Sequence, residues 1–380
     1  MTALRIGVCG GGVGGLAAAI ALRMAGHDPV VFERAAKFER VGADVNFTPN
    51  AVHALDRLGV GEVLRMTSAE PTHRISRMWD TGEETSRLPL RGEAEKRYGA
   101  PQLTLHRADF LKALEARIPA ASIRLGRQVA GVIPGGESAD DRSAIRFRDG
   151  SEEDVDVIVG ADGIHSAVRN ALWGKDDPRF TGLVSYRAVV PRDAVKDVPN
   201  IDAFTKWWGP TPDRQIVTFP LTKGEEIFVF ATTAQEGWTD EGWTLPGDPD
   251  ELRSVYADFH PEARALLEPV TEVTKSALHV REPMAHWSKG RATLLGDAAH
   301  PMVPFMAQGA CMAVEDAVVL ARALEGKSRG DVPAALRSYE AARLERTAAI
   351  QRNSLANEWM KQQGNADWVY GYHAWEAELA

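Results

Sequence analysis

The sequence predicts an α/β (α+β) fold in which a Rossmann-like domain is interrupted by an inserted antiparallel β-sheet and completed by C-terminal helices. Three observations support this prediction. A short apolar run, a glycine-rich loop and an Ala/Leu-rich helical segment open the chain. Strand-like runs separated by Pro- and Trp-rich loops occupy its middle, and two long segments with helical periodicity close it.

The opening residues predict a strand, a helix and a second strand. Residues 4–9 have the apolar composition of a buried strand, and a helix is expected over residues 13–25, ended by Gly26. The second strand is expected at residues 29–32. A strand, a helix and a second strand form a βαβ unit, because the helix returns the chain to the end of the sheet where the first strand began, and the two strands then lie parallel in one sheet.

The later segments predict further elements of both parts of the fold. A helix is expected from about residue 104, and strands of the first domain at 122–125, 144–147, 155–159 and 292–295. Strands of the inserted sheet are expected at 183–190, 215–219 and 227–232, and the closing helices at 308–324 and 333–360.

Composition excludes several classes of function. The 44 Lys and Arg residues are outnumbered by 53 Asp and Glu residues, no basic run occurs, and nucleic acid is therefore not a predicted partner. No segment has the ~20 apolar residues of a membrane span. Cys9 and Cys311 fit neither a disulfide framework nor a zinc-ligand spacing, so the sequence predicts a cytoplasmic protein without a metal site.

A glycine-rich loop follows the first predicted strand. Gly10, Gly12 and Gly15 have GxGxxG spacing, Gly14 lies within the loop, and Glu33 follows the second predicted strand. Glycines let the backbone approach a pyrophosphate at a helix N-terminus, and an acid at this place binds ribose hydroxyls. The loop predicts a site for a dinucleotide, either FAD or NAD; the alternative is a tight glycine turn without a ligand.

A second motif follows the strand predicted at 155–159. Residues 156–169, Asp-Val-Ile-Val-Gly-Ala-Asp-Gly-Ile-His-Ser-Ala-Val-Arg, resemble the Asp-Gly fingerprint of flavoprotein hydroxylases. The strand brings Asp162 to a glycine turn, where its carboxylate can organise backbone and ribose or pyrophosphate groups. The alternative is an Asx turn that caps a helix at Ser166, and one loop can serve both purposes.

A third motif, Leu-Leu-Gly-Asp-Ala-Ala-His-Pro at 294–301, resembles the second FAD fingerprint of the same enzymes, in which Asp297 contacts the ribityl chain. Residues 304–311 form a loop of small residues that opens a helix. Its backbone N–H groups are expected to face the flavin pyrimidine ring, where negative charge accumulates on reduction. Without this resemblance, Asp297 would be a helix N-cap and His300 a packed loop residue.

The three fingerprints together, in this order, resemble the single-component class A flavoprotein aromatic hydroxylases over essentially the whole chain. Lys-Trp-Trp at 206–208 and Asp-Trp-Val-Tyr-Gly-Tyr at 367–372 are similar to the branch of 6-hydroxynicotinate 3-monooxygenase and salicylate hydroxylase. On this resemblance we expect a FAD-binding domain over residues 1–72, 100–181 and 276–380. A substrate-binding domain is expected over residues 73–99 and 182–275.

The resemblance also implies which residues hold FAD. They are Gly10, Gly12, Gly14, Gly15, Glu33, Arg34, Asn46, Arg107, Val129, Asp162, Asp297, Gly309, Ala310 and Cys311. NADH or NADPH is then a transient co-substrate that binds over the flavin, because no second GxGxxG motif provides a stable nicotinamide site. The similar branch favours NADH.

Residues around the substrate are expected chiefly from the inserted sheet, where Arg or Lys can pair with a carboxylate and Tyr can bond a phenolate. The expected catalytic residues are Asn46, Tyr186, Arg214, Gln215, Phe219 and Pro304, with Arg187, Lys206 and Trp208 as further candidates for contact. The hydroxynicotinate enzymes carry a histidine in place of Asn46 and a tyrosine near Phe219. Since neither Asn nor Phe can act as a base, His73 and His300 are alternative proton carriers.

The resemblance implies a monooxygenase that hydroxylates a small hydroxylated aromatic or N-heteroaromatic carboxylic acid with NAD(P)H and O2, through a flavin C4a-hydroperoxide. The substrate would be a hydroxypyridine carboxylate or a salicylate-like acid, with or without loss of CO2. Two alternatives remain: another FAD oxidoreductase of this fold, such as an epoxidase or a reductase, and a non-catalytic flavin-binding regulatory protein. A monomer or a homodimer is expected.

Overall fold

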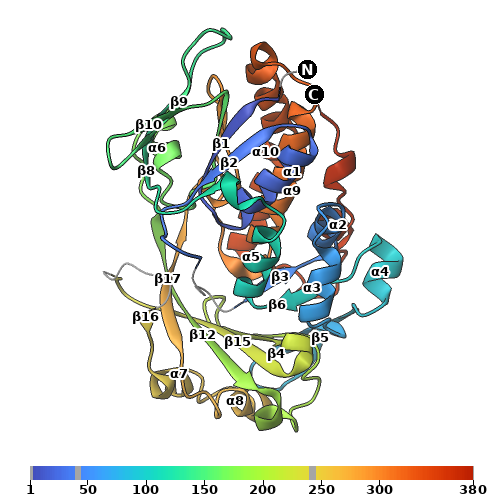
Figure 1. Cartoon of the computed structure of the whole chain (residues 1–380). Coiled ribbons are helices and arrows are strands. Elements are labelled where there is room, and N and C mark those ends of the chain that lie inside the picture. The colour runs from blue at the N-terminus through green and yellow to red at the C-terminus, as the bar shows by residue number, and fades with distance from the viewer. Residues whose placement is uncertain (1–2, 39–43, 239–244, 380) are drawn as a thin grey trace.

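The computed structural model describes residues 3–38, 44–238 and 245–379. Figure 1 shows two stacked parts: a parallel sheet with long helices above, and a large twisted sheet below that carries two short helices on its far side. The helices are α1 Val13–Met24, α2 Pro49–Arg57, α3 Gly61–Thr67, α4 Glu93–Tyr98, α5 Arg107–Glu115, α6 Ala167–Trp173, α7 Pro249–Val255, α8 Pro261–Ala265, α9 Gly309–Leu324, α10 Val332–Ala356 and α11 Asp367–Tyr370.

The upper sheet is five-stranded and entirely parallel, in the order β18-β11-β1-β2-β7. Its strands are β1 Arg5–Cys9, β2 Asp28–Phe32, β7 Ile123–Arg124, β11 Val157–Gly160 and β18 Ala292–Leu294. The predicted opening βαβ unit is confirmed. Because β1, β11 and β18 are neighbours with the same direction, the three sequence motifs that follow them meet at one edge of the sheet.

The lower sheet has eight strands in the order β16-β17-β12-β15-β14-β13-β4-β5. They are β4 His73–Met78, β5 Glu84–Pro89, β12 Arg179–Pro191, β13 Phe204–Trp208, β14 Gln215–Leu221, β15 Glu226–Ala234, β16 Leu245–Pro246 and β17 Thr274–Val280. Neighbours run antiparallel except β13 and β4, which are parallel. The predicted fold class is confirmed. The division into domains stays a prediction, and β12 and β17 each extend a few residues beyond the boundaries drawn for it.

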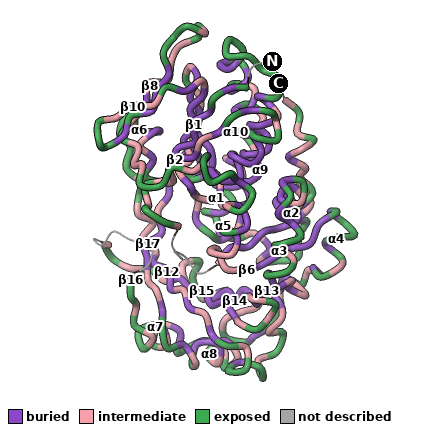
Figure 2. The backbone as a smooth tube through the Cα atoms, viewed as in Figure 1, coloured by how far each residue is buried: buried purple, intermediate pink, exposed green. Residues whose placement is uncertain are grey.

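The two faces of this sheet bury different sets of residues. Side chains at alternate positions, Tyr186 among them, pack against α7 and α8 in one apolar cluster. The side chains between them pack on the opposite side against Val303 and Phe305. We call this second side the inner face, since residues 303 and 305 belong to the loop that leads into α9. Figure 2 shows buried residues in purple on the central elements of the upper part, such as β1 and α9, and on β14 of the lower sheet.

The end of α10 determines how the chain returns to the sheet. The helix was predicted to reach residue 360, but Asn357 is left-handed, with φ 52°, and forms its C-cap. The chain then crosses strands β4 and β5: Ser76 Oγ donates to the carbonyl of Met360 at 2.6 Å, and Thr85 Oγ1 to that of Lys361 at 2.6 Å. We call residues 357–372 the C-terminal segment; it covers this edge of the inner face.

Smaller elements complete the described chain. They are the pair β3 Val45–Phe47 and β6 Leu103–Leu105, and the sheet of β8 Val129–Ile133, β9 Ala144–Phe147 and β10 Glu152–Asp154. Both cysteines are free and buried, and the cytoplasmic location stays a prediction. No helix in the described ranges is long and apolar enough to cross a membrane. The same residues contain no cluster of three His, Cys, Asp or Glu side chains suited to a metal ion.

Candidate active site

The glycine loop after β1 is shaped by two close backbone contacts. Gly10 has φ +111°, and a Cβ atom on Gly15 would lie 1.9 Å from the Gly10 carbonyl oxygen, so neither position accepts a side chain. A Cβ on Gly14 would lie 2.5 Å from Leu295 Cδ1. Gly12 differs, because a Cβ there would meet no atom of the other described residues within 4 Å. The loop therefore leaves an open cradle at the N-terminus of α1, as a pyrophosphate requires.

Glu33 follows β2 beside this loop. Its carboxylate accepts hydrogen bonds from the backbone N–H of Gly11 at 2.7 Å and of Ala35 at 2.8 Å. Arg34 is exposed next to it, and Val129, at the start of β8, is half-buried. The carboxylate is thus fixed at the edge of the cradle, where a ribose would follow a bound pyrophosphate.

Asp162 lies after β11 and caps α6. Its carboxylate accepts hydrogen bonds from the Ser166 hydroxyl and from the backbone N–H of Ala167 at 2.7 Å. A Cβ on Gly10 would come within 3.0 Å of Asp162 Cα, so the first and second motifs touch. The predicted helix cap is present, and the same loop forms one wall of the cradle.

Asp297 lies in the loop after β18, where the third motif meets α9. The residue is exposed, yet burial of the surrounding site raises its pKa, a combination expected of a carboxylate that lines a deep opening. Arg107 lies near enough to lower that pKa, and Asp297 Oδ1 would be 4.0 Å from a Cβ on Gly309. The structure therefore brings Asp297, Arg107 and the start of α9 together.

Asp44 adds a second acid to this region. Burial raises the pKa of its carboxyl to about 6, although Arg187 and Arg107 act in the opposite direction. Arg187, on the inner face of β12, donates to Ser276 Oγ at 2.6 Å. Through Arg187, the inserted sheet therefore places a charged side chain near Asp44, as Arg107 does from the other part of the fold.

The start of α9 offers backbone donors rather than side chains. Ala307 has φ 56°, an uncommon left-handed conformation for alanine that turns the chain into the helix. Gly309 and Ala310 are half-buried, whereas the Cys311 thiol points into the protein towards the Asn46 carbonyl and Thr48. Burial raises the pKa of this thiol to about 11. Any contact of residues 309–311 with FAD would be made by the main chain.

A buried network of ion pairs holds the loop of the third motif, residues 294–301, in place. Arg343 on α10 pairs with Glu315 at 2.7 Å and with Asp316 at 2.8 Å, and all three side chains are 0% exposed. His300 Nε2 lies 2.6 Å from Asp316, which also accepts from the backbone N–H of Gly296 at 3.0 Å. Because the network ties α9 and α10 to both ends of the third motif, it fixes where Asp297 lies. His300 therefore has a structural role in this network.

Asp316 should make wild-type stability depend on pH. Burial would raise the pKa of Asp316, but His300 and Arg343 lower it from 3.8 to about 2. A carboxyl with a depressed folded-state pKa stabilises the fold above its unfolded pKa, and this contribution is lost as pH falls through the window from 3.8 to about 2. Urea unfolding of the wild type and Asp316→Asn should differ equally at about pH 7 and about pH 5. The difference should shrink only below about pH 4. A difference that already disappears at about pH 5 would contradict this assignment.

The inner face of the sheet is aromatic. Phe219 stacks on Phe204 with ring centres 5.1 Å apart and planes 3° apart, and Phe228 lies against it at 5.0 Å. Phe305, in the loop before α9, packs against the same cluster. Pro304 beside it is exposed. These rings form an apolar wall against which the loop that precedes α9 packs.

Two buried amides lie at this wall with unused donors. Gln215 is 1% exposed and Asn46 is 6% exposed, and among the described residues neither Gln215 Nε2 nor Asn46 Nδ2 has a hydrogen-bond partner. Gln215 lies at the start of β14. Asn46 pairs with Thr104, whose hydroxyl donates to the carbonyl of Pro220 near the other end of that strand. The donors therefore mark the two ends of the aromatic wall.

Two of the predicted substrate residues, Tyr186 and Arg214, lie on the side of the sheet opposite to the inner face. Tyr186 belongs to the apolar cluster against α7 and α8. Arg214 binds Asp258 at 2.6 Å and lies 5.3 Å above the Phe259 ring, on the same side. Because side chains alternate along a strand, both side chains point away from the inner face, on which Phe219 lies. His73 lies one position from Arg74 on β4 and faces away from it for the same reason.

Four polar residues in the hydrogen-bond networks of Asn46 and Gln215 were not predicted from the sequence. Gln102 Nε2 donates to Asn46 Oδ1 at 3.1 Å, and the Tyr370 hydroxyl lies 3.5 Å from Gln102 Oε1. Arg74 approaches Tyr370, and Asn357 joins Lys206 to Gln215. The Trp-Val-Tyr-Gly-Tyr stretch was a signal for one of them, Tyr370. Nothing marked Gln102 or Arg74.

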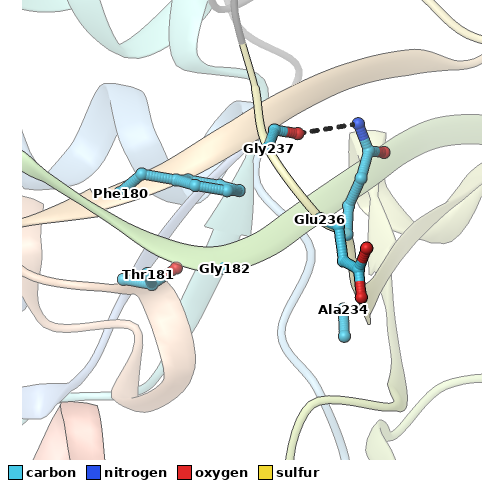
Figure 3. Close-up of a pocket in the computed structure, with 7 residues that line it drawn as sticks. Phe180, Thr181, Gly182, Ala234, Glu236 and Gly237 are labelled. Atoms are coloured by element: carbon cyan, nitrogen blue, oxygen red, sulfur yellow. Dashed lines mark hydrogen bonds between the residues drawn. The ribbon is translucent and has the colours of Figure 1, made fainter.

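A separate hollow of about 540 Å³ lies at the N-terminal end of β12. It is lined by Phe180, Thr181 and Gly182 and by residues 234–237 (Figure 3). Figure 3 shows the Phe180 ring on one side and the exposed carboxylate of Glu236 on the other. The hollow offers an acid and no cation among its lining residues, so it does not favour an anionic ligand.

The residues present fit FAD. The cradle that a Cβ at Gly12 would enter suits a pyrophosphate, and Glu33 beside it suits a ribose. Asp297 and the backbone at Gly309 suit the ribityl chain and the flavin, with Asn46 close to Cys311. Roles of single residues towards FAD stay predictions, including those of Arg34 and Val129.

Comparison with known proteins gives matches over nearly the whole chain. The family described as FAD binding domain matches residues 3–354. The chain is 37% identical over 376 residues to 6-hydroxynicotinate 3-monooxygenase of Bordetella bronchiseptica, covering 99% of this chain and 97% of that relative. A salicylate hydroxylase substrate complex has a TM-score of 0.84 at 28% identity, covering 98% of this chain and 96% of the other. Klebsiella pneumoniae HpxO complexed with FAD and uric acid has a TM-score of 0.81 at 27% identity, covering 93% and 87%.

Proposed function

Since this chain belongs to the FAD binding domain family and is a FAD-dependent aromatic monooxygenase, we propose that it hydroxylates a small aromatic carboxylic acid that already carries a ring hydroxyl. FAD is the cofactor. NADH serves as the transient electron donor and dioxygen as the oxidant. A reductase or a non-catalytic flavoprotein would need neither an aromatic wall nor polar groups at its ends.

One observation carries the proposal. An aromatic wall built by Phe204, Phe219 and Phe228 has buried amide donors without partners at both ends, on Gln215 and Asn46. A buried N–H without a partner costs about 1–3 kcal/mol, so a ligand that supplies an acceptor at each end is favoured. A planar ring with a carboxylate and a hydroxyl oxygen meets both requirements.

Each part of the site has a task in this reaction. FAD, when bound, would pass the electrons of NADH to dioxygen, of which one oxygen atom enters the ring and the other leaves as water. The aromatic wall orients the substrate ring against the loop before α9 and excludes water. Gln215 and Asn46 would hold the ring by hydrogen bonds to its oxygens, and the backbone N–H groups of residues 309–311 would stabilise the negative charge that a reduced flavin carries.

The finer substrate assignment is a hydroxypyridine carboxylate or a salicylate-like acid. The relative at 37% identity, named for 6-hydroxynicotinate, supports the first choice. Asn46 and Phe219 differ from the histidine and tyrosine expected in such enzymes, so a compound related to 6-hydroxynicotinate is favoured over 6-hydroxynicotinate itself. If the carboxylate is on the attacked carbon, hydroxylation expels CO2.

The test is a screen of hydroxypyridine carboxylates, salicylate and hydroxybenzoates with the FAD-loaded protein. NADH oxidation, oxygen uptake and product mass are measured together. We expect at least one acid to stimulate NADH oxidation and to gain one oxygen atom, with or without loss of CO2. Yellow protein that oxidises no NADH above its basal rate with any of these acids would refute the proposal.

Phe219→Leu should weaken substrate binding and leave FAD in place. The change removes an aromatic ring from the wall on which the substrate ring is proposed to pack, and an aromatic pair contributes about 0.5–1.5 kcal/mol beyond burial. We expect KM for the acid to rise by roughly three- to tenfold while the flavin content stays stoichiometric. Tyr186→Phe is the control, because Tyr186 lies on the opposite face of the sheet. The KM of this variant for the acid should equal that of the wild type. A larger effect at Tyr186 than at Phe219 would show that the wrong face has been chosen.

A further inference from the structure

Lys206 begins a chain of hydrogen bonds that ends at Gln215. Lys206 is 3% exposed, and its Nζ donates to Asn357 Oδ1 at 2.6 Å. Asn357 Nδ2 donates to the carbonyl of Pro212 at 2.8 Å and to Gln215 Oε1 at 3.3 Å. A backbone carbonyl only accepts, so Pro212 fixes which way the Asn357 amide points. The Gln215 carbonyl is therefore occupied, and its NH2 group is the end left free.

Arg74 lies at the start of a second chain, which ends at Asn46. Arg74 is 4% exposed and approaches the Tyr370 hydroxyl, which lies 3.5 Å from Gln102 Oε1. Gln102 Nε2 donates to Asn46 Oδ1 at 3.1 Å. A guanidinium has donors and no acceptor, so the chain can run only from Arg74 outwards. The free end is again an NH2 group, that of Asn46.

The region behind the wall is rich in donors and poor in acceptors. Within the described residues, neither Arg74 nor Lys206 forms an ion pair with a carboxylate, and aromatic rings surround both: Arg74 lies 4.5 Å from the centre of Trp359, and Lys206 lies 3.6 Å from that of Trp208. Five buried nitrogens here lack partners, all of them donors: Asn46 Nδ2, Arg74 Nη1, Trp208 Nε1, Gln215 Nε2 and Trp359 Nε1. Burial lowers the pKa of Lys206 and of Arg74, and an anion bound in front of them would favour their charged forms.

We propose that these two chains are positioning devices that make the substrate pocket donor-only, so that the enzyme selects carboxylates over their neutral amides. The inference rests on the proposed function and deepens it. The carboxylate binds at the Gln215 end, where Lys206 lies two hydrogen bonds away, and the ring oxygen binds at Asn46. Gln215 and Asn46 touch the substrate; Lys206, Asn357, Arg74, Tyr370 and Gln102 act through them.

The conservative variant Asn357→Asp tests the direction of the first chain. An aspartate still accepts from Lys206 but cannot donate to Gln215, so the Gln215 amide loses the bond that fixes it and its carbonyl can turn towards the substrate. FAD-loaded protein is titrated with 6-hydroxynicotinate and 6-hydroxynicotinamide, and with salicylate and salicylamide, following the flavin absorbance. The wild type should bind the acid at least about tenfold more tightly than the amide in one of the pairs.

In Asn357→Asp, affinity for that acid should fall by about ten- to hundredfold, while affinity for its amide stays within about threefold. Asn353→Asp is the matched control: it makes the same change four residues earlier on α10, where the exposed Asn353 side chain donates to the Ala349 carbonyl at 2.9 Å. It should change neither affinity. Lys206→Met, which removes the charge, should lower affinity for the acid in the same selective way.

Three results would overturn the inference: no preference of the wild type for the acid in either pair, an equal loss of acid and amide binding in Asn357→Asp, or loss of FAD from that variant. The last two would show a merely structural role. Failure of the proposed function is recognised separately. In that case the acid binds selectively but stimulates no NADH oxidation and gains no oxygen.

Discussion

Replacing Gly12 by valine is expected to give a folded protein that does not retain FAD. A Cβ at this position meets no protein atom within 4 Å, so a side chain there enters only the cradle at the start of α1. Gly12 is the N-cap of α1 and has φ −77°, which valine adopts readily, and the loss of a good cap residue costs only about 1 kcal/mol. Overlap with a bound pyrophosphate should weaken FAD binding by about ten- to hundredfold.

The measurement is flavin content after purification, together with a fluorescence titration of the apoprotein with FAD. Gly330→Val is the control, because Gly330 is exposed and its nearest neighbour to a new Cβ would be 4.0 Å away. It should retain a full complement of FAD. Stoichiometric flavin in Gly12→Val would show that the pyrophosphate does not occupy this cradle.

Replacing Arg343 by methionine should destabilise the protein more than any surface change. The substitution leaves Glu315 and Asp316 buried, with Arg343 no longer between them. Removal of one partner from a buried ion pair costs about 3–5 kcal/mol, because the remaining charges stay desolvated. Since the network also fixes the third motif through Gly296, FAD affinity should decrease in parallel.

Urea unfolding of both proteins measures this effect. Arg337→Met, six residues earlier on the same helix, removes an exposed pair with Glu137 and should cost at most about 1 kcal/mol. Similar unfolding midpoints for Arg343→Met and the wild type would contradict the role given to the network.

The parts of the fold that sequence reasoning identified are local. The glycines between residues 10 and 15, the acid at 33 and the loop at 297 each follow a short buried strand, and their spacing contains the information needed. Parallel neighbours bring such strand ends together, so the position of the FAD site could be predicted from the motifs alone. An Asx turn that caps a helix at Ser166 was the alternative interpretation of the second motif, and Asp162 accepts hydrogen bonds from Ser166 and Ala167 there.

The substrate side of the site could not be read in this way. A shift of one residue decides which face of a strand a side chain occupies, and Tyr186 and Arg187 illustrate the two outcomes. The hydrogen bonds that orient Asn46 and Gln215 come from Gln102 and Asn357, which lie far away along the chain. No periodicity or spacing connects residues that meet only through the tertiary fold.

The most direct test of the central claim is the origin of the oxygen in the product. The FAD-loaded enzyme is supplied with NADH, an accepted aromatic acid and ¹⁸O2, and the product is analysed by mass spectrometry. A monooxygenase transfers one atom of dioxygen to the ring, so the product should carry one ¹⁸O atom. A product without the label, or NADH oxidation that yields only hydrogen peroxide with every acid, would contradict it.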